Sequence, residues 1–172
     1  MAKQSVRVLL VEDNPEDAQV IEEVLTEETD TLFDVTWANS LAAGLKVFEQ
    51  GKVEVVLLDL KLPDSQGLDT LAKMCQQEPD VPIVILTASD DEWMASQALQ
   101  HGAQDYLVKG YVQVYPNLLQ RAMRYAMERK HTDATHKKTQ SEAECFKNDI
   151  RQLQREVDAL LHERGRPPKY GT

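Results

Sequence analysis

Hydrophobic positions over the first 127 residues alternate between two patterns. Short continuous apolar runs are typical of strands buried on both faces, and apolar residues three and four apart indicate helices that pack on one side. The predicted strands are Val6–Val11, Phe33–Trp37, Val53–Leu58, Pro82–Leu86 and Gln104–Val108. The predicted helices are Glu16–Thr29, Ser40–Gln50, Ser65–Gln77, one from near Asp90 to His101, and one that opens at Pro116.

Turn and cap residues separate these segments. Asn14-Pro15 predicts a helix N-cap followed by proline at the first helical position. Gly51 ends the second predicted helix, and the run Ser89-Asp90-Asp91-Glu92 predicts a capping box at the start of the fourth. Five strand–helix repeats predict an α/β fold, a doubly wound parallel sheet of five strands with helices on both faces.

The pattern changes after residue 127. Residues 128–142 are almost entirely polar, and apolar residues then recur at spacings of 3, 4, 3, 4 and 3. They are Ala143, Phe146, Ile150, Leu153, Val157 and Leu160. This is a heptad seam, which predicts a helical extension over residues 128–164 that pairs two chains as a coiled coil. The alternative is a helix that packs only on its own domain. Residues 165–172 contain Gly165, Pro167 and Pro168 and are expected to fray.

Charge follows the same division. The 172 residues carry a net charge of −10; residues 1–127 hold 9 basic and 21 acidic side chains, and residues 128–172 hold 10 and 8. Such acidity argues against general binding to nucleic acid backbones. Cys75 and Cys145 have neither metal-site nor disulfide-framework spacing. Without a signal peptide or a run of about 20 apolar residues, a cytoplasmic protein that does not enter the membrane is expected.

Charged and hydroxyl side chains stand at the ends of four predicted strands. Glu12-Asp13 follow the first strand, Asp59 the third, Thr87 the fourth and Lys109 the fifth. The carboxyl ends of parallel strands share one edge of a sheet, where ligands bind. Three carboxylates attract a hard cation such as Mg²⁺.

A phosphoryl group is the substrate that suits this set. A cation and an ammonium would keep Asp59 ionised and nucleophilic. If Asp59 attacks phosphorus, Thr87 and Lys109 can stabilise charge on the phosphoryl oxygens. Each residue also has an ordinary explanation, namely helix capping for Asp13, a turn hydroxyl for Thr87 and a solvated charge for Lys109. The interpretation therefore depends on the joint pattern.

Four motifs make residues 5–127 resemble a response-regulator receiver domain, the phosphoacceptor part of two-component signalling. They are VLLVEDNPED, VVLLDLKLPDSQGL, PIVILTAS and GAQDYLVKG. The resemblance implies a flavodoxin-like sheet of strand order 2-1-3-4-5. It implies that Asp59 accepts a phosphoryl group from a sensor histidine kinase or a histidine phosphotransfer protein. It also implies Mg²⁺ bound by Glu12, Asp13, Asp59 and the backbone carbonyl of Lys61.

The resemblance assigns further roles around Asp59. It makes Thr87 the switch hydroxyl, Lys109 the partner of the phosphoryl group, and Tyr106 the switch aromatic that turns inward when Thr87 moves. An ordinary half-buried strand tyrosine is the alternative for Tyr106. Pro63 and Gly67 match the loop after Asp59 and the start of the third helix.

One position departs from the family pattern. Gly110 follows Lys109, where the family usually has a proline, often with a cis peptide bond. Glycine removes that preference, so the sequence leaves open the conformation of a predicted loop over residues 109–115.

The tail indicates how the domain would act. Residues 128–172 show neither a helix-turn-helix pattern nor a catalytic signature. We therefore expect no enzyme, only a receiver with its own phosphorylation and dephosphorylation chemistry, which acts by protein contacts or as a homodimer. The run over residues 117–126 also resembles receivers that continue into kinase, cyclase or phosphatase modules, so a regulatory fragment is the alternative. A haloacid-dehalogenase-type phosphatase would need an acid in place of Lys61 and is disfavoured.

Overall fold

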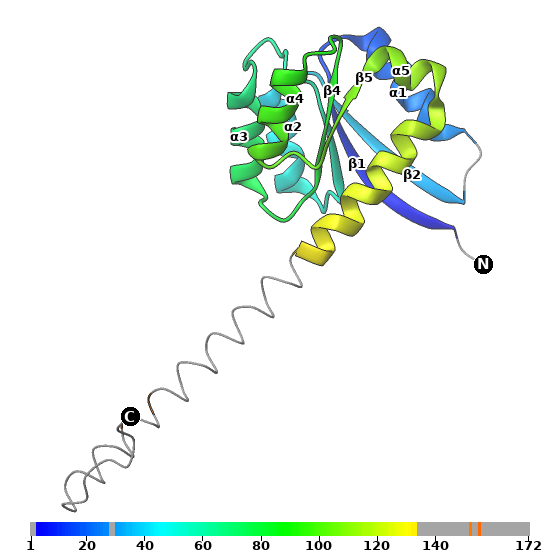
Figure 1. The fold of residues 1–172 in the computed structure, drawn as a ribbon. Coiled ribbons are helices and arrows are strands. Elements are labelled where there is room, and N and C mark those ends of the chain that lie inside the picture. The colour runs from blue at the N-terminus through cyan, green and yellow to red at the C-terminus, as the bar shows by residue number, and fades with distance from the viewer. Residues whose placement is uncertain (1–2, 28–29, 134–151, 153–154, 156–172) are drawn as a thin grey trace, which may run out of the picture. The chain divides into compact units, whose positions relative to one another are not determined.

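A single parallel sheet of five strands forms the centre of the fold (Figure 1). The computed structural model describes residues 3–27, 30–133, 152 and 155. The strand order is β2-β1-β3-β4-β5, and all four neighbouring pairs are parallel. The strands are β1 (Gln4–Val11), β2 (Thr31–Ala38), β3 (Val55–Leu58), β4 (Ile83–Thr87) and β5 (Asp105–Val108). The predicted fold class and strand order are confirmed.

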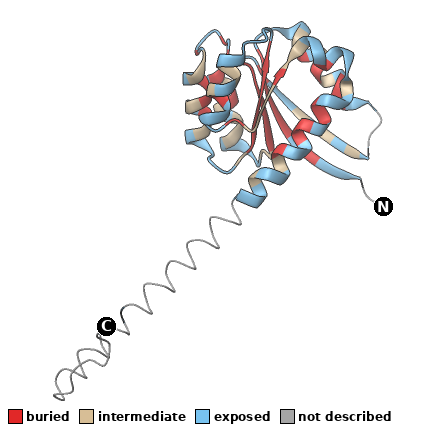
Figure 2. Ribbon diagram, in the orientation of Figure 1, coloured by how far each residue is buried: buried red, intermediate tan, exposed pale blue. Residues whose placement is uncertain are grey.

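Helices cover both faces of the sheet (Figure 1). They are α1 (Pro15–Thr26), α2 (Leu41–Gln50), α3 (Leu68–Gln77), α4 (Glu92–Gln100), α5 (Lys109–Val114) and a helix described over residues 116–133. α1 and the helix over 116–133 pack on one face, and α2, α3 and α4 pack on the other. The central strands β3 and β4 are buried on both faces, which explains their continuous apolar runs (Figure 2).

Two separate clusters of buried side chains lie on the two faces of the sheet. We call the cluster beneath α1 and residues 116–133 the α1-side core. It includes Val8, Leu10, Ile21, Leu25, Leu57, Leu86, Leu107, Leu119 and Met123. We call the cluster beneath α2, α3 and α4 the α3-side core. It includes Leu9, Val11, Leu41, Val56, Leu58, Leu71, Met74, Ile85 and Ala98. Alternate residues of each strand enter alternate cores, as the pleat requires.

The start of α1 agrees with its sequence signals. Asn14 is the N-cap, its Oδ1 accepts a hydrogen bond of 2.9 Å from the amide of Glu16, and Pro15 is the first helical residue. The buried stripe was also predicted correctly. It consists of Ala18, Ile21, Val24 and Leu25. The helix ends at Thr26, three residues before the predicted end.

The predicted start of α3 at Ser65 and the predicted cap of α4 at Ser89 were wrong. Asp91, rather than Ser89, caps α4, because Asp91 Oδ1 accepts a hydrogen bond of 3.0 Å from the amide of Met94. The amide of Ser89 instead donates to Thr87 Oγ1 at 3.3 Å, so Ser89 belongs to the turn. The α3 helix begins only after Gly67, whose φ of 66° is a left-handed conformation that interrupts a helix.

Residues 109–114 are helical, which the sequence did not predict. The short helix α5 begins at Lys109 and contains Gly110. It stops at Tyr115 because the residue before a proline is disfavoured in the helical region, and the next helix begins at residue 116. All peptide bonds within the described ranges are trans.

The C-terminal part forms a unit of its own. The chain divides into residues 1–131 and residues 132–172, and the domain boundary after residue 127 stays a prediction. The predicted heptad segment lies outside the described residues, apart from Gln152 and Arg155, which are helical and exposed. The predicted fraying of residues 165–172 also lies outside them. In the part of the chain that is described, none of the helices is long and apolar enough to cross a bilayer.

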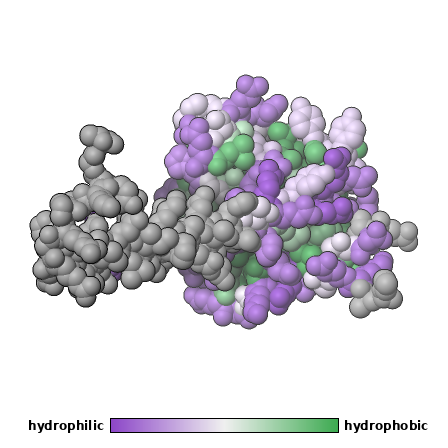
Figure 3. Space-filling model, turned by 60° about the horizontal axis from the view of Figure 1, so that its bottom comes forward, coloured by the Kyte–Doolittle hydropathy of each residue, from purple (hydrophilic) through white to green (hydrophobic). Residues whose placement is uncertain are grey.

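Most of the surface seen in Figure 3 is polar, in agreement with the net charge of −10. Figure 3 shows one face on which hydrophilic side chains predominate and hydrophobic ones form smaller areas. The large apolar side chains that are exposed include Trp37, Trp93, Tyr111, Val114 and Tyr115. Two of them, Trp37 and Tyr111, belong to segments that border the carboxyl edge of the sheet.

We predict that Gly44→Ala destabilises the fold. A Cβ at Gly44, in α2, would lie 2.9 Å from Val11 Cγ2 in the α3-side core. Overpacking of a core costs about 1–3 kcal/mol, which exceeds the gain of up to about 1 kcal/mol in helix propensity. The matched control is Gly110→Ala, which replaces a helical glycine with no neighbouring heavy atom within 4 Å and should not destabilise. Urea unfolding measures both; equal stability of the two variants would contradict the packing argument.

Candidate functional site

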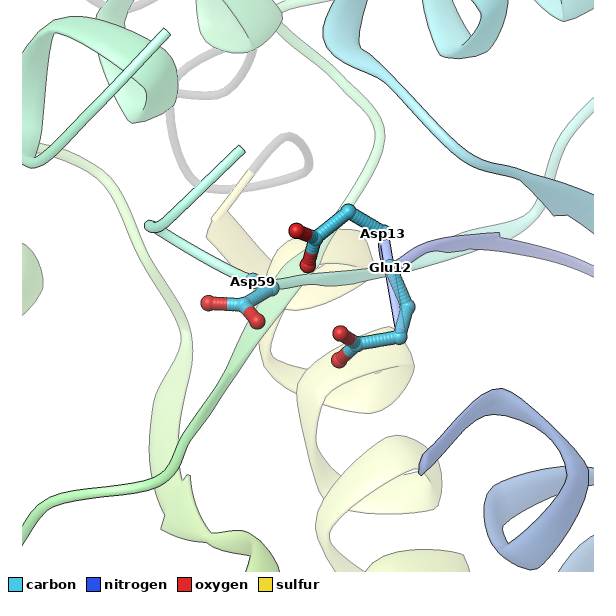
Figure 4. A group of neighbouring side chains, drawn as sticks. All are labelled: Glu12, Asp13 and Asp59. Carbon is cyan, nitrogen blue, oxygen red and sulfur yellow. The ribbon is translucent and has the colours of Figure 1, made fainter. Parts of the chain in front are cut away.

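The acidic residues predicted at the strand ends do converge. Glu12 and Asp13 follow β1, Asp59 follows β3, and one oxygen of each carboxylate lies within 4.8 Å of the other two (Figure 4). Glu12 and Asp59 are buried, and Asp13 is exposed. The site is therefore a cluster of two buried carboxylates and one exposed carboxylate.

The alternation of the strands directs three charged side chains to the same side of the sheet. Glu12, Asp59 and Lys109 each follow, by two positions, a strand residue of the α1-side core. Those strand residues are Leu10, Leu57 and Leu107. Because side chains two apart in a strand point to the same face, the three charges meet on the face that α1 covers.

Lys109 is the centre of this charge cluster. Its Nζ lies 2.9 Å from Asp59 Oδ2 and 3.0 Å from Asp17 Oδ2, and it is nearer still to Glu12 Oε2. Burial alone would lower the pKa of Lys109, but the close contacts of its ammonium with the Asp59, Glu12 and Asp17 carboxylates outweigh burial and raise that pKa above its ordinary value. Lys109 therefore stays charged throughout the physiological pH range.

Glu12 is the carboxylate with the strongest penalty for ionisation. Burial raises the pKa of Glu12 to about 7 against the opposing effect of Lys109. Oε1 accepts a hydrogen bond of 3.1 Å from the amide of Asn14. Oε2 forms an ion pair with Lys109 Nζ, but the two groups are not aligned for a hydrogen bond. Within the described ranges, Oε2 is the one buried side-chain polar atom that has no hydrogen-bond partner.

These carboxylates suit a hard divalent cation. Carboxylate oxygens and water are the ligands that Mg²⁺ prefers, and the exposed Asp13 leaves room for water beside the two buried carboxylates. A cation beside Glu12 would also favour its ionised form, which burial disfavours. The chemistry of the donors thus agrees with the predicted metal ligands Glu12, Asp13 and Asp59.

The loop after β3 holds Asp59 in place. Asp59 Oδ1 accepts a hydrogen bond of 2.9 Å from the amide of Lys61, and the amide of Asp59 donates to Val11 O at 3.0 Å. The amide of Gly67 donates to Leu60 O at 2.7 Å and closes the loop. Pro63 is exposed at its tip. Lys61 thus contributes its amide to the site, and the metal contact of its carbonyl stays a prediction.

Thr87 and Tyr106 lie on the other side of the sheet. Thr87 follows Ile85 by two positions, and Tyr106 is the register partner of Ile85. Ile85 belongs to the α3-side core, and the half-buried Tyr106 packs against that core. Thr87 is buried at the end of β4, between the strands that carry Asp59 and Lys109. Both predicted switch residues share one face, and their switch roles stay predictions.

Three site contacts were not predicted from the sequence. Asp17, in the first turn of α1, bonds to Lys109. Trp37 Nε1 donates to Glu12 O at 2.8 Å. Asp64, in the loop after Asp59, accepts hydrogen bonds of 2.9 Å from the amides of Leu41 and Ala42 at the start of α2. The only sequence signal was an acid in the first turn of a helix, and it does not distinguish Asp17 from Glu16.

The match to known proteins agrees with this geometry. The model of the response regulator receiver domain family matches residues 8–123.

The chain belongs to the response regulator receiver domain family.

Relatives of this receiver domain include complete regulators and solved domains. The probable C4-dicarboxylate response regulator DctR of Bacillus subtilis is 31% identical over 129 residues, 75% of this chain and 54% of that protein. A receiver domain from Clostridium thermocellum has a TM-score of 0.63 and 29% identity, over 74% of this chain and 98% of that one. The Mn²⁺-bound form of response regulator Rcp1 has a TM-score of 0.55 and 26% identity, over 63% and 89%. The chain spans about half or less of the length of the curated relatives it matches.

We predict that Asp64 stabilises the receiver domain only in its ionised form. Hydrogen bonds from the amides of Ala42 and Leu41 lower the pKa of Asp64 below its ordinary value of 3.8. Its contribution is therefore complete above pH 3.8 and is lost as the pH falls through the lower folded-state pKa. Asp64→Ala should cost about 1 kcal/mol at pH 7, the usual worth of a helix cap.

Ser40→Ala is the control for Asp64→Ala. Ser40 caps the same helix, because its Oγ accepts a hydrogen bond of 3.1 Å from the amide of Ala43, and its hydroxyl does not titrate. Urea unfolding between pH 7 and pH 3 should show the Asp64→Ala difference shrinking towards low pH while the Ser40→Ala difference stays constant. A constant difference for both variants would contradict the assignment.

Proposed function

We propose that this receiver domain accepts a phosphoryl group on Asp59 from the phosphohistidine of a sensor kinase or a histidine phosphotransfer protein. The observation that carries the proposal is the position of Asp59: buried at a strand end, 2.9 Å from the Lys109 ammonium and within 4.8 Å of two further carboxylates. An aspartate used only for folding gains little from such like-charged neighbours.

The residues present account for each part of the transfer. A carboxylate oxygen of Asp59 bonds to phosphorus, the bond between phosphorus and the donor's histidine nitrogen breaks, and the imidazole leaves as the neutral base after taking up a proton. Lys109 then faces a phosphoryl oxygen in place of a carboxylate oxygen, so its charge keeps an anionic partner throughout. The amide of Lys61 orients Asp59 by its hydrogen bond to Oδ1, the carboxylate oxygen that does not face Lys109.

A bound Mg²⁺ belongs to the same proposal. Glu12, Asp13 and Asp59 would hold it, with Lys61 O as a further ligand. When bound, it would screen the charge of the carboxylates and of the phosphoryl oxygens. The proximity of the three carboxylates supports this assignment, as does the Mn²⁺-bound structure of the similar regulator Rcp1.

Phosphorylation tests the proposal directly. Incubation with acetyl phosphate and Mg²⁺ should add one phosphoryl group to the chain, and an excess of EDTA should suppress the addition. Asp59→Asn should abolish it, because the amide is no nucleophile. Asp69→Asn, which changes an exposed aspartate paired with Lys73, is the control and should react like the wild type.

Intact-mass spectrometry measures the added group. Stoichiometric labelling of the Asp59→Asn variant, or equal labelling with and without the chelator, would contradict the proposal.

We further propose that the chain acts through protein contacts as a homodimer in the cytoplasm, with the phosphorylation chemistry of Asp59 as its only reaction. The heptad pattern of residues 143–160 supports pairing. We expect the double substitution Ile150→Asp with Leu153→Asp to convert a dimer to a monomer, because two apolar positions of the heptad seam would become charged. Light scattering gives the mass; an unchanged value would remove the coiled-coil proposal.

A further inference from the structure

Asp17 forms a contact in the site for which the proposed function has no role so far. It is the third residue of α1, and its Oδ2 accepts a hydrogen bond of 3.0 Å from Lys109 Nζ. Its side chain is 33% exposed and that of Lys109 is 13% exposed, so water screens this ion pair only in part. The contact joins segments 92 residues apart in the chain.

Asp17 differs from the other two carboxylates that touch Lys109. Glu12 and Asp59 both belong to the group of acids that could hold a cation, and Asp17 does not. Cation binding would involve Glu12 and Asp59, and phosphorylation would modify Asp59, whereas neither would modify Asp17. Of the three carboxylates that contact Lys109, Asp17 is the one that lies outside the proposed cation site.

The geometry also shows that Asp17 does not draw Lys109 away from Asp59. The Lys109 ammonium has three N–H donors, and it contacts Asp17 and Asp59 at 3.0 and 2.9 Å at the same time. Both bonds are short enough to be well formed. Asp17 and Asp59 thus hold the ammonium from two directions, which fixes its position better than Asp59 alone.

We propose that Asp17 is a positioning residue for phosphoryl transfer, which holds the Lys109 ammonium at the place where the phosphoryl oxygens of phosphorylated Asp59 will lie. This inference rests on the proposed function. A positioned cation stabilises developing charge without reorganisation during the reaction, and a misplacement of about 1 Å can cost about 100-fold in rate. Because Glu12 and Asp59 would still contact Lys109 without Asp17, we expect a smaller loss, about tenfold.

The sequence offers a matched control next to Asp17. Glu16 is also an acid in the first turn of α1, it is exposed, and its side chain makes no contact with Lys109 in the described part of the chain. Substitution of either residue removes one negative charge from the same helix terminus, so both variants lose the same helix-dipole interaction. Only the substitution of Asp17 also removes the bond to Lys109.

The experiment follows phosphorylation of the full chain by acetyl phosphate over a range of Mg²⁺ concentrations, by intact-mass spectrometry. For Asp17→Ala we expect a maximal rate about tenfold lower at an unchanged Mg²⁺ concentration for half-maximal rate, because Asp17 is no cation ligand. Asp17→Asn keeps an oxygen that can accept the hydrogen bond without its charge, so its maximal rate should lie between those of Asp17→Ala and the wild type. Glu16→Ala should match the wild type.

Each result decides the inference. A maximal rate for Asp17→Ala equal to that of Glu16→Ala overturns it, and a higher rate overturns it in favour of competition between Asp17 and the phosphoryl group. A change only in the Mg²⁺ requirement overturns it as well. If Asp17→Ala does not fold, the isosteric Asp17→Asn replaces it, and a maximal rate for Asp17→Asn equal to that of Glu16→Ala overturns the inference. Failure of the wild type to react at all overturns the proposed function itself, and the inference with it.

Discussion

One ammonium among several carboxylates is the constraint on which the site depends. Glu12, Asp17 and Asp59 all contact Lys109, and Asp13 lies beside them. Opposite unit charges about 4 Å apart attract by about 4 kcal/mol where the effective dielectric constant is near 20, and the carboxylates repel one another in the same range. A single lysine therefore leaves excess negative charge, which a cation can balance. Burial disfavours this negative charge most at Glu12, whose pKa it raises.

The sheet produces this arrangement from simple regularities. Parallel strands bring their carboxyl ends to one edge, and the pleat places Glu12, Asp59 and Lys109 on the face covered by α1, with Thr87 and Tyr106 on the other. The two cores therefore lie beneath chemically different halves of the site. The charged half holds the proposed phosphoacceptor Asp59, and the other half holds the predicted switch residues Thr87 and Tyr106. Movement of Thr87 towards Asp59 would connect the two faces across the strand ends.

The sequence alone predicted the parts that depend on periodicity and strand order. Buried strands, the cap at Asn14 and the convergence of the strand ends all follow from local pattern and from the geometry of parallel sheets. The predicted cap of α4 was wrong because Asp91 and Ser89 are both good caps, and only the turn that binds Ser89 decides between them. The contacts of Asp17 and Asp64 could not be predicted, because they join elements whose relative placement depends on how the helices pack.

The most direct measurement is a crystal structure of the chain with Mg²⁺ and beryllium fluoride, which imitates a phosphoryl group on a carboxylate. The account predicts beryllium on a carboxylate oxygen of Asp59, the metal among Glu12, Asp13 and Asp59, and Lys109 in contact with a fluorine. Beryllium fluoride bound at another residue, or bound to Asp59 with Lys109 turned away to solvent, would contradict it.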